Sequence, residues 1–241
     1  VYLISVVTPS VRETGLDIVA KCLKRQTFTD YEWIIVSPFK FVSTDERVVW
    51  IQEPNKKEGD YYNLNKAWNQ AFKLAIGELI ISIVYLQWFP PNTLESFWTH
   101  YNADKKACIS GIGHHYEKIM FGKPEKLVWT NPLYKQDKMF YEISPIDCEL
   151  CLTSIPRQAI LDVGGVDEKF DLYAANSEKE LCNRISKLGY KFYMDQSIEF
   201  RAIHHERLNK EWDDHYFKGM PYYQQCLKET NEGQRLKLTF V

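Results

Sequence analysis

The stretch "YYNLNKAWNQAFKLAIGELIISIV", Tyr61 to Val84, joins a helical pattern directly to a buried-strand pattern. Its first part spaces apolar residues by three and four: Leu64, Ala67, Trp68, Ala71 and Phe72. This is the spacing of one face of an α-helix, and Gly77 is a residue type that commonly follows a helix end. The run from Leu79 to Val84 is almost purely apolar, as in a strand covered on both faces. The switch is typical of βαβ units and predicts an α/β fold with a mixed, mostly parallel central sheet.

The segments before this stretch continue the alternation. We expect three strands, at Tyr2–Pro9, Tyr31–Pro38 and Arg47–Pro54, because each run is rich in β-branched and aromatic residues. A helix is predicted at 14–26, with Thr14 as its cap. Another helix follows the double proline at Pro90 and Pro91, because proline is tolerated in a first helical turn.

The later part of the chain is less regular. Strands are expected at 106–118, 139–156, 190–195 and 198–205, and helices at 156–165 and 177–189. From Leu208 onward the sequence is polar, aromatic and predicted to be helical. We therefore expect one domain at 1–207, with a nucleotide-sugar half (1–100) and an acceptor half (101–207), followed by a helical tail at 208–241.

The composition excludes several classes of partner. Of the 241 residues 45% are hydrophobic and 26% are charged, and the net charge of −2 provides no bulk attraction to nucleic acid or anionic membrane. The apolar runs are shorter than the roughly 18 residues that span a bilayer. With six cysteines and no recognisable leader, we expect reduced thiols and a cytoplasmic location. "CELC" (Cys148–Cys151) is interpreted as buried thiols on a strand, with a metal or redox pair as the weaker alternative.

Five segments follow one another in the order and spacing of a known family. They are "ISVVTPSVR" (4–12), "YEWIIVS" (31–37), "NLNKAWNQAFKLAIGELI" (63–80), "SIPRQAILDVGGVDEKFD" (154–171) and "SEKELCNRISKLGYKFYMD" (177–195). Together they resemble the inverting glycosyltransferases of family 2, which have the GT-A fold. The resemblance covers Ile4 to His205.

The resemblance implies a pocket for a nucleotide-sugar donor. In that family a turn after the first strand receives the nucleotide, and further contacts come from the second strand end and from the next helix. The matching positions here are Thr8, Pro9, Ser10, Arg12, Ser37, Asn65, Lys66 and Tyr85. Ser37 stands where the family often has an acidic pair. A capped strand-to-helix turn and a solvated Lys66 are the structural alternatives.

The family's metal-binding Asp-x-Asp motif is degenerate in this chain. Val84, Tyr85 and Leu86 occupy its positions, and none of them is a good ligand for Mn²⁺ or Mg²⁺. Three explanations remain open: cationic and hydroxyl side chains (Arg12, Lys66, Tyr85) replace the metal, other groups hold it weakly, or the chain is a non-catalytic relative. A divalent metal is thus possible as a cofactor, and His205 is its weak candidate ligand.

The resemblance also implies a catalytic carboxylate. Glu178 in "NSEKELCNR" matches the general base of the family, Ser177 replaces the first acid of the usual pair, and Glu180 is the nearby alternative. An inverting transfer needs such a group to take a proton from the acceptor hydroxyl. The structural alternative is a carboxylate that only complements the helix dipole.

Aromatic side chains are the candidates for the acceptor side, because flat rings stack on the apolar faces of sugars. We expect Trp88, Trp129 and Tyr173 there, with Tyr134 as a further candidate. His114 and His115 are expected to be structural.

The expected reaction is sugar transfer from a nucleotide-diphosphate sugar to a hydroxyl of a glycan, lipid-linked or protein-linked acceptor, with inversion. The alternative is a domain that binds a nucleotide sugar or glycan without turnover. A nucleotidyltransferase is disfavoured, because "PSVRETG" (Pro9–Gly15) lacks a glycine-rich basic signature.

Overall fold

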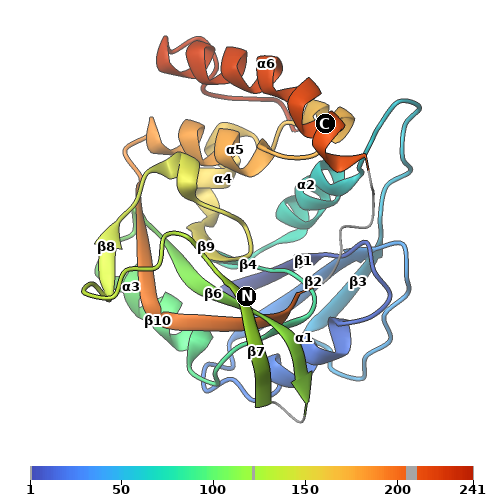
Figure 1. Ribbon diagram of the computed structural model, residues 1–241, viewed down its shortest axis with the longest axis vertical. Helices are drawn as coiled ribbons and strands as arrows, with labels where there is room; N and C mark the ends of the chain where they lie inside the picture. The colour runs from blue at the N-terminus through green and yellow to red at the C-terminus, as the bar shows by residue number, and fades with distance from the viewer. Residues whose placement is uncertain (1, 121–122, 205–210, 241) are drawn as a thin grey trace.

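The computed structural model describes residues 2–120, 123–204 and 211–240. Within these residues the strands form one ten-stranded sheet, with the order β3-β2-β1-β4-β9-β6-β10-β5 and with β7 and β8 paired to β6 and β10 (Figure 1). The strands are β1 (Ile4–Pro9), β2 (Tyr31–Ser37), β3 (Val48–Gln52), β4 (Leu79–Ile83), β5 (Gln87–Trp88), β6 (Ala107–Met120), β7 (Lys123–Thr130), β8 (Phe140–Glu142), β9 (Leu152–Pro156) and β10 (Lys191–Ile203).

The first four strands of the order are parallel, as the sequence predicts. Every residue of β1, β2 and β4 is buried, which explains why these strands are mostly apolar. Antiparallel β9 then joins β4 to the second half of the sheet, where β6 and β10 are parallel to each other. The sheet is therefore mixed, and its parallel N-terminal part brings the carboxyl ends of β1, β2 and β4 to one edge.

Helices cover both faces of the sheet. They are α1 (Leu16–Leu23), α2 (Leu64–Leu74), α3 (Thr93–Ala103), α4 (Arg157–Val163), α5 (Ser177–Ser186) and α6 (Trp212–Asn231), with 3₁₀ turns η1 (Pro145–Asp147) and η2 (Glu168–Leu172). The apolar faces of α2, α4 and α5 form one buried cluster, and those of α1 and α3 form a second cluster on the opposite face (Figure 1). Burial of these two clusters is the main favourable term for the fold.

Three sequence expectations are wrong in detail. Thr14 does not cap α1, which follows Gly15 in a left-handed conformation at φ 99°. The "CELC" segment lies in a turn between η1 and β9 and not on a strand, although all six cysteines are free thiols. The two strands expected at 190–205 form one strand, β10, with a register shift between Asp195 and Glu199. The strand β7 was not expected at all.

Gly77 has a different role from the one its position suggests. The C-cap of α2 is Ala75, and a Cβ on Gly77 would lie 2.6 Å from the main chain of Ile4 and Ser5. The glycine therefore permits the close approach of the α2–β4 connection to β1.

The C-terminal segment packs on the rest of the chain. Helix α6 contacts α5 and η2, where Tyr223 and Cys226 form a small buried cluster with Phe170 (Figure 1). Further on, Leu238 donates a backbone hydrogen bond to Val163 at 2.8 Å. The expected domain boundary at 207/208 lies outside the described residues, so that division stays a prediction. In the described part of the chain, every helix is too short or too polar to cross a bilayer.

Candidate functional site

The candidate site begins where β1 and β2 end. Pro9 is paired with Val36 in the parallel register, and the Ser10 amide donates a hydrogen bond to the Val36 carbonyl at 2.9 Å. Thr8, Pro9, Ser10 and Ser37 all lie here, as expected for the ends of adjacent parallel strands. The structure therefore brings these four predicted donor residues together.

The hydroxyl groups of these residues are used within the protein. Thr8 Oγ1 accepts a hydrogen bond from the Trp33 indole at 2.9 Å, and Ser37 Oγ accepts one from the Phe39 amide at 3.1 Å. Ser10 Oγ donates to the Arg12 carbonyl at 2.9 Å. Because all three hydroxyls are buried and paired, they stabilise the turns. The cationic side chain of this segment is that of Arg12.

Arg12 reaches the neighbouring strand end. Its Nε donates a hydrogen bond to the Tyr85 hydroxyl at 3.1 Å, and its guanidinium lies 5.9 Å from the centre of the tyrosine ring. Tyr85 is the second residue after β4, in the segment interpreted from the sequence as a degenerate metal motif. Thus the predicted donor residues Arg12 and Tyr85 meet at the carboxyl ends of β1 and β4.

Leu86 follows Tyr85 and lies against the start of α1. A Cβ built on Gly15 would lie 2.7 Å from Leu86 Cγ and 2.8 Å from the Leu86 amide nitrogen, so the loop after β4 lies directly against the start of α1. Leu86 itself adopts φ 61°, which is unusual for a non-glycine residue. The loop is therefore closely packed at the place where the family holds its metal.

The residues in this loop do not fit a divalent cation. Val84 and Leu86 have no donor atoms in their side chains, and the Tyr85 phenol, hydrogen-bonded to Arg12, is a poor ligand for a hard cation. Among the described residues, no group of three or more His, Cys, Asp or Glu side chains could hold a metal ion. The candidate ligand His205 lies outside the described residues.

Asn65 and Lys66 have partners that conflict with the expected donor role. At the start of α2 both backbone amides donate to the Asp171 carboxylate, at 2.9 and 3.2 Å, and the Asn65 side-chain amide donates to it at 3.0 Å. The Lys66 ammonium forms an ion pair with Asp60. The positive end of this helix therefore already holds a carboxylate of the chain itself, which replaces the expected contact with a diphosphate.

Glu178 lies near the end of β4. It is in the first turn of α5 and partly buried, and its carboxylate accepts a hydrogen bond from the Leu150 amide. The next residue, Cys151, accepts a hydrogen bond from the Val84 amide at 3.3 Å. The backbone of residues 150–151 thus connects Glu178, the predicted base, to Val84 at the end of β4.

The surroundings of Glu178 raise its pKa well above the ordinary value of a glutamate. Burial raises the pKa of Glu178 to about 7, and the negative charge of Glu149 adds to the increase, while Lys179 and the Leu150 amide oppose it. A carboxylate with a pKa near the working pH is suited to proton transfer.

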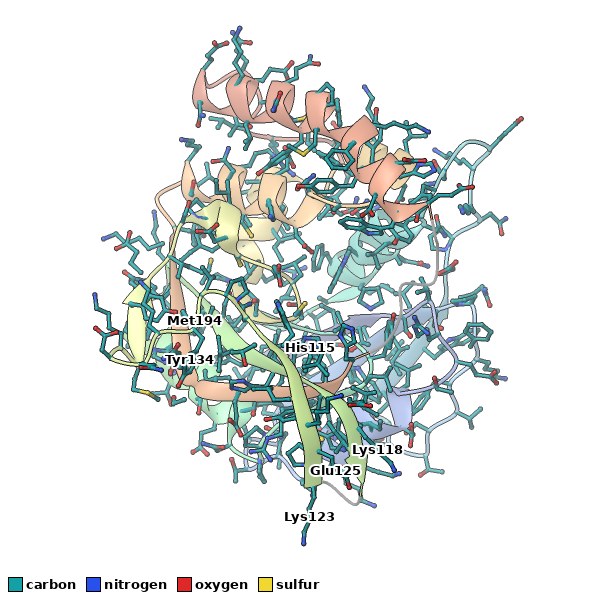
Figure 2. The ribbon with its side chains drawn as sticks, viewed as in Figure 1. His115, Lys118, Lys123, Glu125, Tyr134 and Met194 are labelled. Atoms are coloured by element: carbon teal, nitrogen blue, oxygen red, sulfur yellow. The ribbon has the colours of Figure 1, made fainter. Side chains whose placement is uncertain are left out.

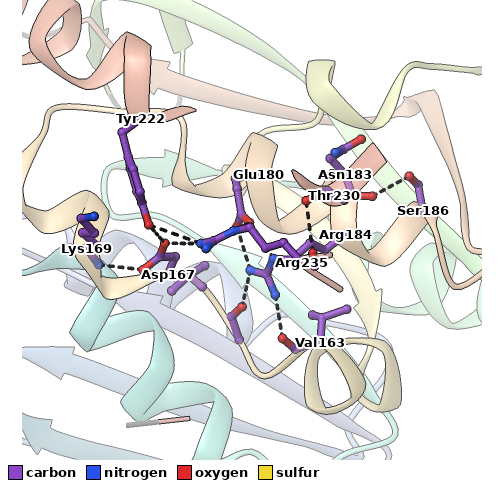
Figure 3. Close-up of polar contacts among 12 residues, drawn as sticks. Val163, Asp167, Lys169, Glu180, Asn183, Arg184, Ser186, Tyr222, Thr230 and Arg235 are labelled. Atoms are coloured by element: carbon purple, nitrogen blue, oxygen red, sulfur yellow. Dashed lines mark hydrogen bonds and ion pairs between the residues drawn. The ribbon is translucent and has the colours of Figure 1, made fainter. Parts of the chain in front are cut away.

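Glu180 is a structural residue. It is completely buried, and its two carboxylate oxygens accept hydrogen bonds from Arg184 at 2.7 and 2.8 Å, while Arg235 adds a third contact at 3.0 Å (Figure 3). Arg184 also donates to the carbonyls of Val163 and Gly165. The alternative assignment of Glu180 as the base is therefore wrong, because this carboxylate is held away from solvent by two arginines.

A cavity of about 170 Å³ lies beside the 149–151 segment. It is lined by Ser110, Gly111, His115, Trp129, Asn131, Asp147, Glu149, Cys151, Leu152, Met194 and Phe200. Two of these residues, His115 on β6 and Met194 on β10, are near the middle of the view in Figure 2. Carboxylates and aromatic rings thus line the same small space, and of the predicted acceptor residues Trp129 lies in it.

The other predicted acceptor residues lie elsewhere. Trp88 is in β5 and lines a separate cavity beside α1, together with Lys21 and Arg25. Tyr173 packs against Gly219 and Tyr222 of α6. Neither residue lines the cavity beside the 149–151 segment, so their assignment to the acceptor side stays a prediction.

The sequence reasoning missed Asp147, Glu149 and His115. Glu149 lies inside the "CELC" stretch, which was interpreted only through the spacing of its two cysteines. His114 is structural as expected, with Nδ1 3.1 Å from Thr130 Oγ1 and a pKa lowered by burial. Its neighbour His115 points to the other face of β6, as successive residues of a strand do, and lines the cavity.

Comparison with solved structures identifies the fold. The chain is similar to the crystal structure of GalNAc-T7 with UDP, GalNAc and Mn²⁺, with a TM-score of 0.66, 13% identity and coverage of 97% of this chain and 55% of that one. It is also similar to S. aureus TarS 1–349 in complex with UDP, with a TM-score of 0.55, 14% identity and coverage of 83% of this chain and 60% of that one. The chain thus spans less than two thirds of either structure. No protein-family model and no curated protein matches it. The structural likeness shows the GT-A fold of glycosyltransferases, as predicted.

Proposed function

We propose that this chain is an inverting glycosyltransferase that moves a sugar from a nucleotide-diphosphate sugar to a hydroxyl acceptor. The single observation that carries the proposal is the position of Glu178, whose carboxylate is held by the Leu150 amide one residue from the contact between Cys151 and the end of β4. In an open α/β sheet this carboxyl edge is the usual place for a ligand.

The donor would lie across the ends of β1, β2 and β4. Backbone groups of the turn at Thr8–Ser10 and of Ser37 would contact the nucleoside, and Arg12 would face the diphosphate. A guanidinium presents several N–H donors to phosphate oxygens, and the Tyr85 hydroxyl holds it in place through the hydrogen bond at 3.1 Å. This cationic contact would take over the stabilisation of the leaving group that a metal provides elsewhere.

The reaction has a simple balance of bonds and protons. Glu178 removes the proton from the acceptor hydroxyl as its oxygen bonds to C1 of the donor sugar, on the face opposite the diphosphate. The bond between C1 and the diphosphate oxygen breaks, and the leaving group takes the electron pair and its negative charge towards Arg12. The product has inverted configuration at C1.

A second candidate is a binding domain without turnover. The observation that favours it is the packing of Leu86 against Gly15, which fills the loop where catalytic relatives hold their metal. In that case the chain would bind a nucleotide sugar or a glycan without cleaving the donor.

A transfer and hydrolysis assay separates the two candidates. Purified chain is incubated with a panel of UDP- and GDP-sugars, with EDTA or with Mn²⁺, and nucleotide release is measured. If the chain is a transferase, it should release nucleotide in EDTA, and Glu178→Gln should reduce this release by at least about a hundredfold. The control Glu46→Gln, at an exposed site, should have no effect. Nucleotide binding without release from any donor would support the binding domain instead.

A further inference from the structure

The cavity beside the 149–151 segment adjoins a second one. The first, of about 170 Å³, extends from Glu149 to Trp129, and the second, of about 430 Å³, is lined by His115, Val128, Trp129 and His204. His115 and Trp129 line both, so the two spaces meet at these rings. At about 30 Å³ per water, the first holds the volume of about six waters, which suits one pyranose ring and not two.

The lining of the first cavity includes two acidic and two uncharged polar residues. Asp147 and Glu149 line it together with the amide of Asn131 and the hydroxyl of Ser110. Carboxylate oxygens accept hydrogen bonds from sugar hydroxyls, and the described lining includes no lysine or arginine. A carboxylated or phosphorylated sugar would meet like charges in a partly buried space, which disfavours its binding.

Trp129, which lines both cavities, offers an aromatic surface. Trp129 is 41% exposed, and the ring of His115 meets its indole edge-to-face at a centroid distance of 4.8 Å. This contact holds the indole in a fixed orientation, which lowers the entropy lost when a ligand stacks on it. The apolar face of a sugar ring matches such a surface.

We infer that the two cavities form an acceptor site for a saccharide of at least two units that carries no negative charge. The terminal unit lies in the first cavity, where its hydroxyls donate to Glu149 and Asp147. The next unit stacks on Trp129, at the boundary with the second cavity. This inference rests on the proposed function and adds the class of acceptor to it. Glu149 binds the acceptor, and Glu178, whose carboxylate accepts a hydrogen bond from the adjacent Leu150 amide, takes the proton.

Saccharide binding can be measured without any donor. The probes are glucose, the neutral disaccharide cellobiose, the amino disaccharide of chitosan and the anionic disaccharide of polygalacturonic acid, observed by saturation-transfer difference NMR with the full chain. We expect the neutral and amino disaccharides to bind several-fold more tightly than glucose, and the anionic one to bind more weakly than both. Equal binding of the anionic disaccharide would overturn the inference.

Variants locate the binding within the cavities. Trp129→Ala should weaken disaccharide binding and leave glucose binding nearly unchanged, whereas Phe217→Ala, which removes an exposed ring on α6, should change neither. Glu149→Gln should weaken neutral disaccharides and strengthen the anionic one. If Trp129→Ala binds disaccharide like the wild type, the inference is wrong.

Kinetics and nucleotide binding separate this inference from the proposed function. Glu149→Gln should raise the acceptor KM with little change in kcat, and Glu178→Gln should lower kcat with little change in KM. The reverse result would make Glu149 the base and overturn its role as a binding residue. Calorimetry with UDP is run in parallel: UDP binding without saccharide binding refutes the acceptor site alone, and saccharide binding without any nucleotide binding refutes the proposed transferase.

Discussion

The Nε of Arg12 donates a hydrogen bond to the hydroxyl of Tyr85 at 3.1 Å, joining the ends of the neighbouring parallel strands β1 and β4. Tyr85 stands in a motif that supplies metal-binding carboxylates in the family this sequence resembles. A cation and a hydroxyl thus lie together where a diphosphate is expected. The proposed binding of the donor depends on Arg12 and Tyr85.

Arg12→Ala should weaken UDP binding by about tenfold to a hundredfold, because a hydrogen bond to a charged group contributes about 1.5–3 kcal/mol. Tyr85→Phe should have a smaller effect in the same direction, since it removes only the group that orients the guanidinium. Isothermal titration calorimetry measures both. Arg25→Ala, at an exposed arginine of the α1 end, is the control, and an equal loss in this control would show that the effect is not specific to Arg12.

Glu178→Gln should remove catalysis and stabilise the fold at alkaline pH. Because the pKa of Glu178 is raised to about 7 in the folded chain from an ordinary value of 4.5, the folded state holds the proton more tightly than the unfolded state does. The wild type therefore loses stability as the pH rises from about 4.5 to 7, by at most about 3 kcal/mol.

Thermal melts of wild type and Glu178→Gln at pH 4 and pH 8 test this. We expect similar Tm values at pH 4 and a higher Tm for the variant at pH 8. In the same pH range, turnover of the wild type should rise through about pH 7 as Glu178 loses its proton. A variant that is equally destabilised at both pH values would show that Glu178 is not the titrating group.

Arg235→Ala should destabilise the chain by about 2 kcal/mol, because it leaves the buried carboxylates of Asp167 and Glu180 with fewer partners (Figure 3). Urea unfolding measures the change. Lys21→Ala, which breaks the exposed pair with Asp17, should change stability by no more than about 0.5 kcal/mol. UDP binding by folded Arg235→Ala should equal that of the wild type, and a loss of binding would place this residue in the site.

Gly15→Ala should destabilise the chain by about 1–3 kcal/mol, because φ 99° is unfavourable for alanine and the new Cβ would meet Leu86. Part of this cost should disappear in the background of Leu86→Ala, since the clash with the leucine side chain is gone. Urea unfolding of the two single variants and the double variant gives the coupling. Strict additivity would show that Leu86 does not pack on the start of α1.

Much of the fold follows from local patterns in the sequence. The mostly apolar runs of β1, β2 and β4 and the spacing in α2 each predict their element, because burial on both faces and on one helical face leave different signatures. The strand β7 was missed because its side chains are mostly exposed. Such a strand exists through its pairing with β6 and has no apolar periodicity of its own.

The site was predictable only where a motif was continuous. Glu178 and Arg12 lie in recognisable segments, whereas the cavity combines His115 on β6, Trp129 on β7 and Glu149 in a turn, and only the folded chain brings these together. Lys66 and Glu180 are the opposite case: the sequence pointed to them, and the structure gives them structural partners. Because both side chains are charged, they were predicted to take part in binding or catalysis. In the structure Lys66 is paired with Asp60, and Glu180 is paired with Arg184 and Arg235.

The central claim is that this GT-A fold binds a nucleoside diphosphate through Arg12 and without a metal. Calorimetry of UDP with EDTA-treated wild-type chain, repeated after addition of Mn²⁺, tests it most directly. The account predicts saturable binding in EDTA with a Kd that Mn²⁺ leaves unchanged. Binding that appears only with Mn²⁺ would contradict it.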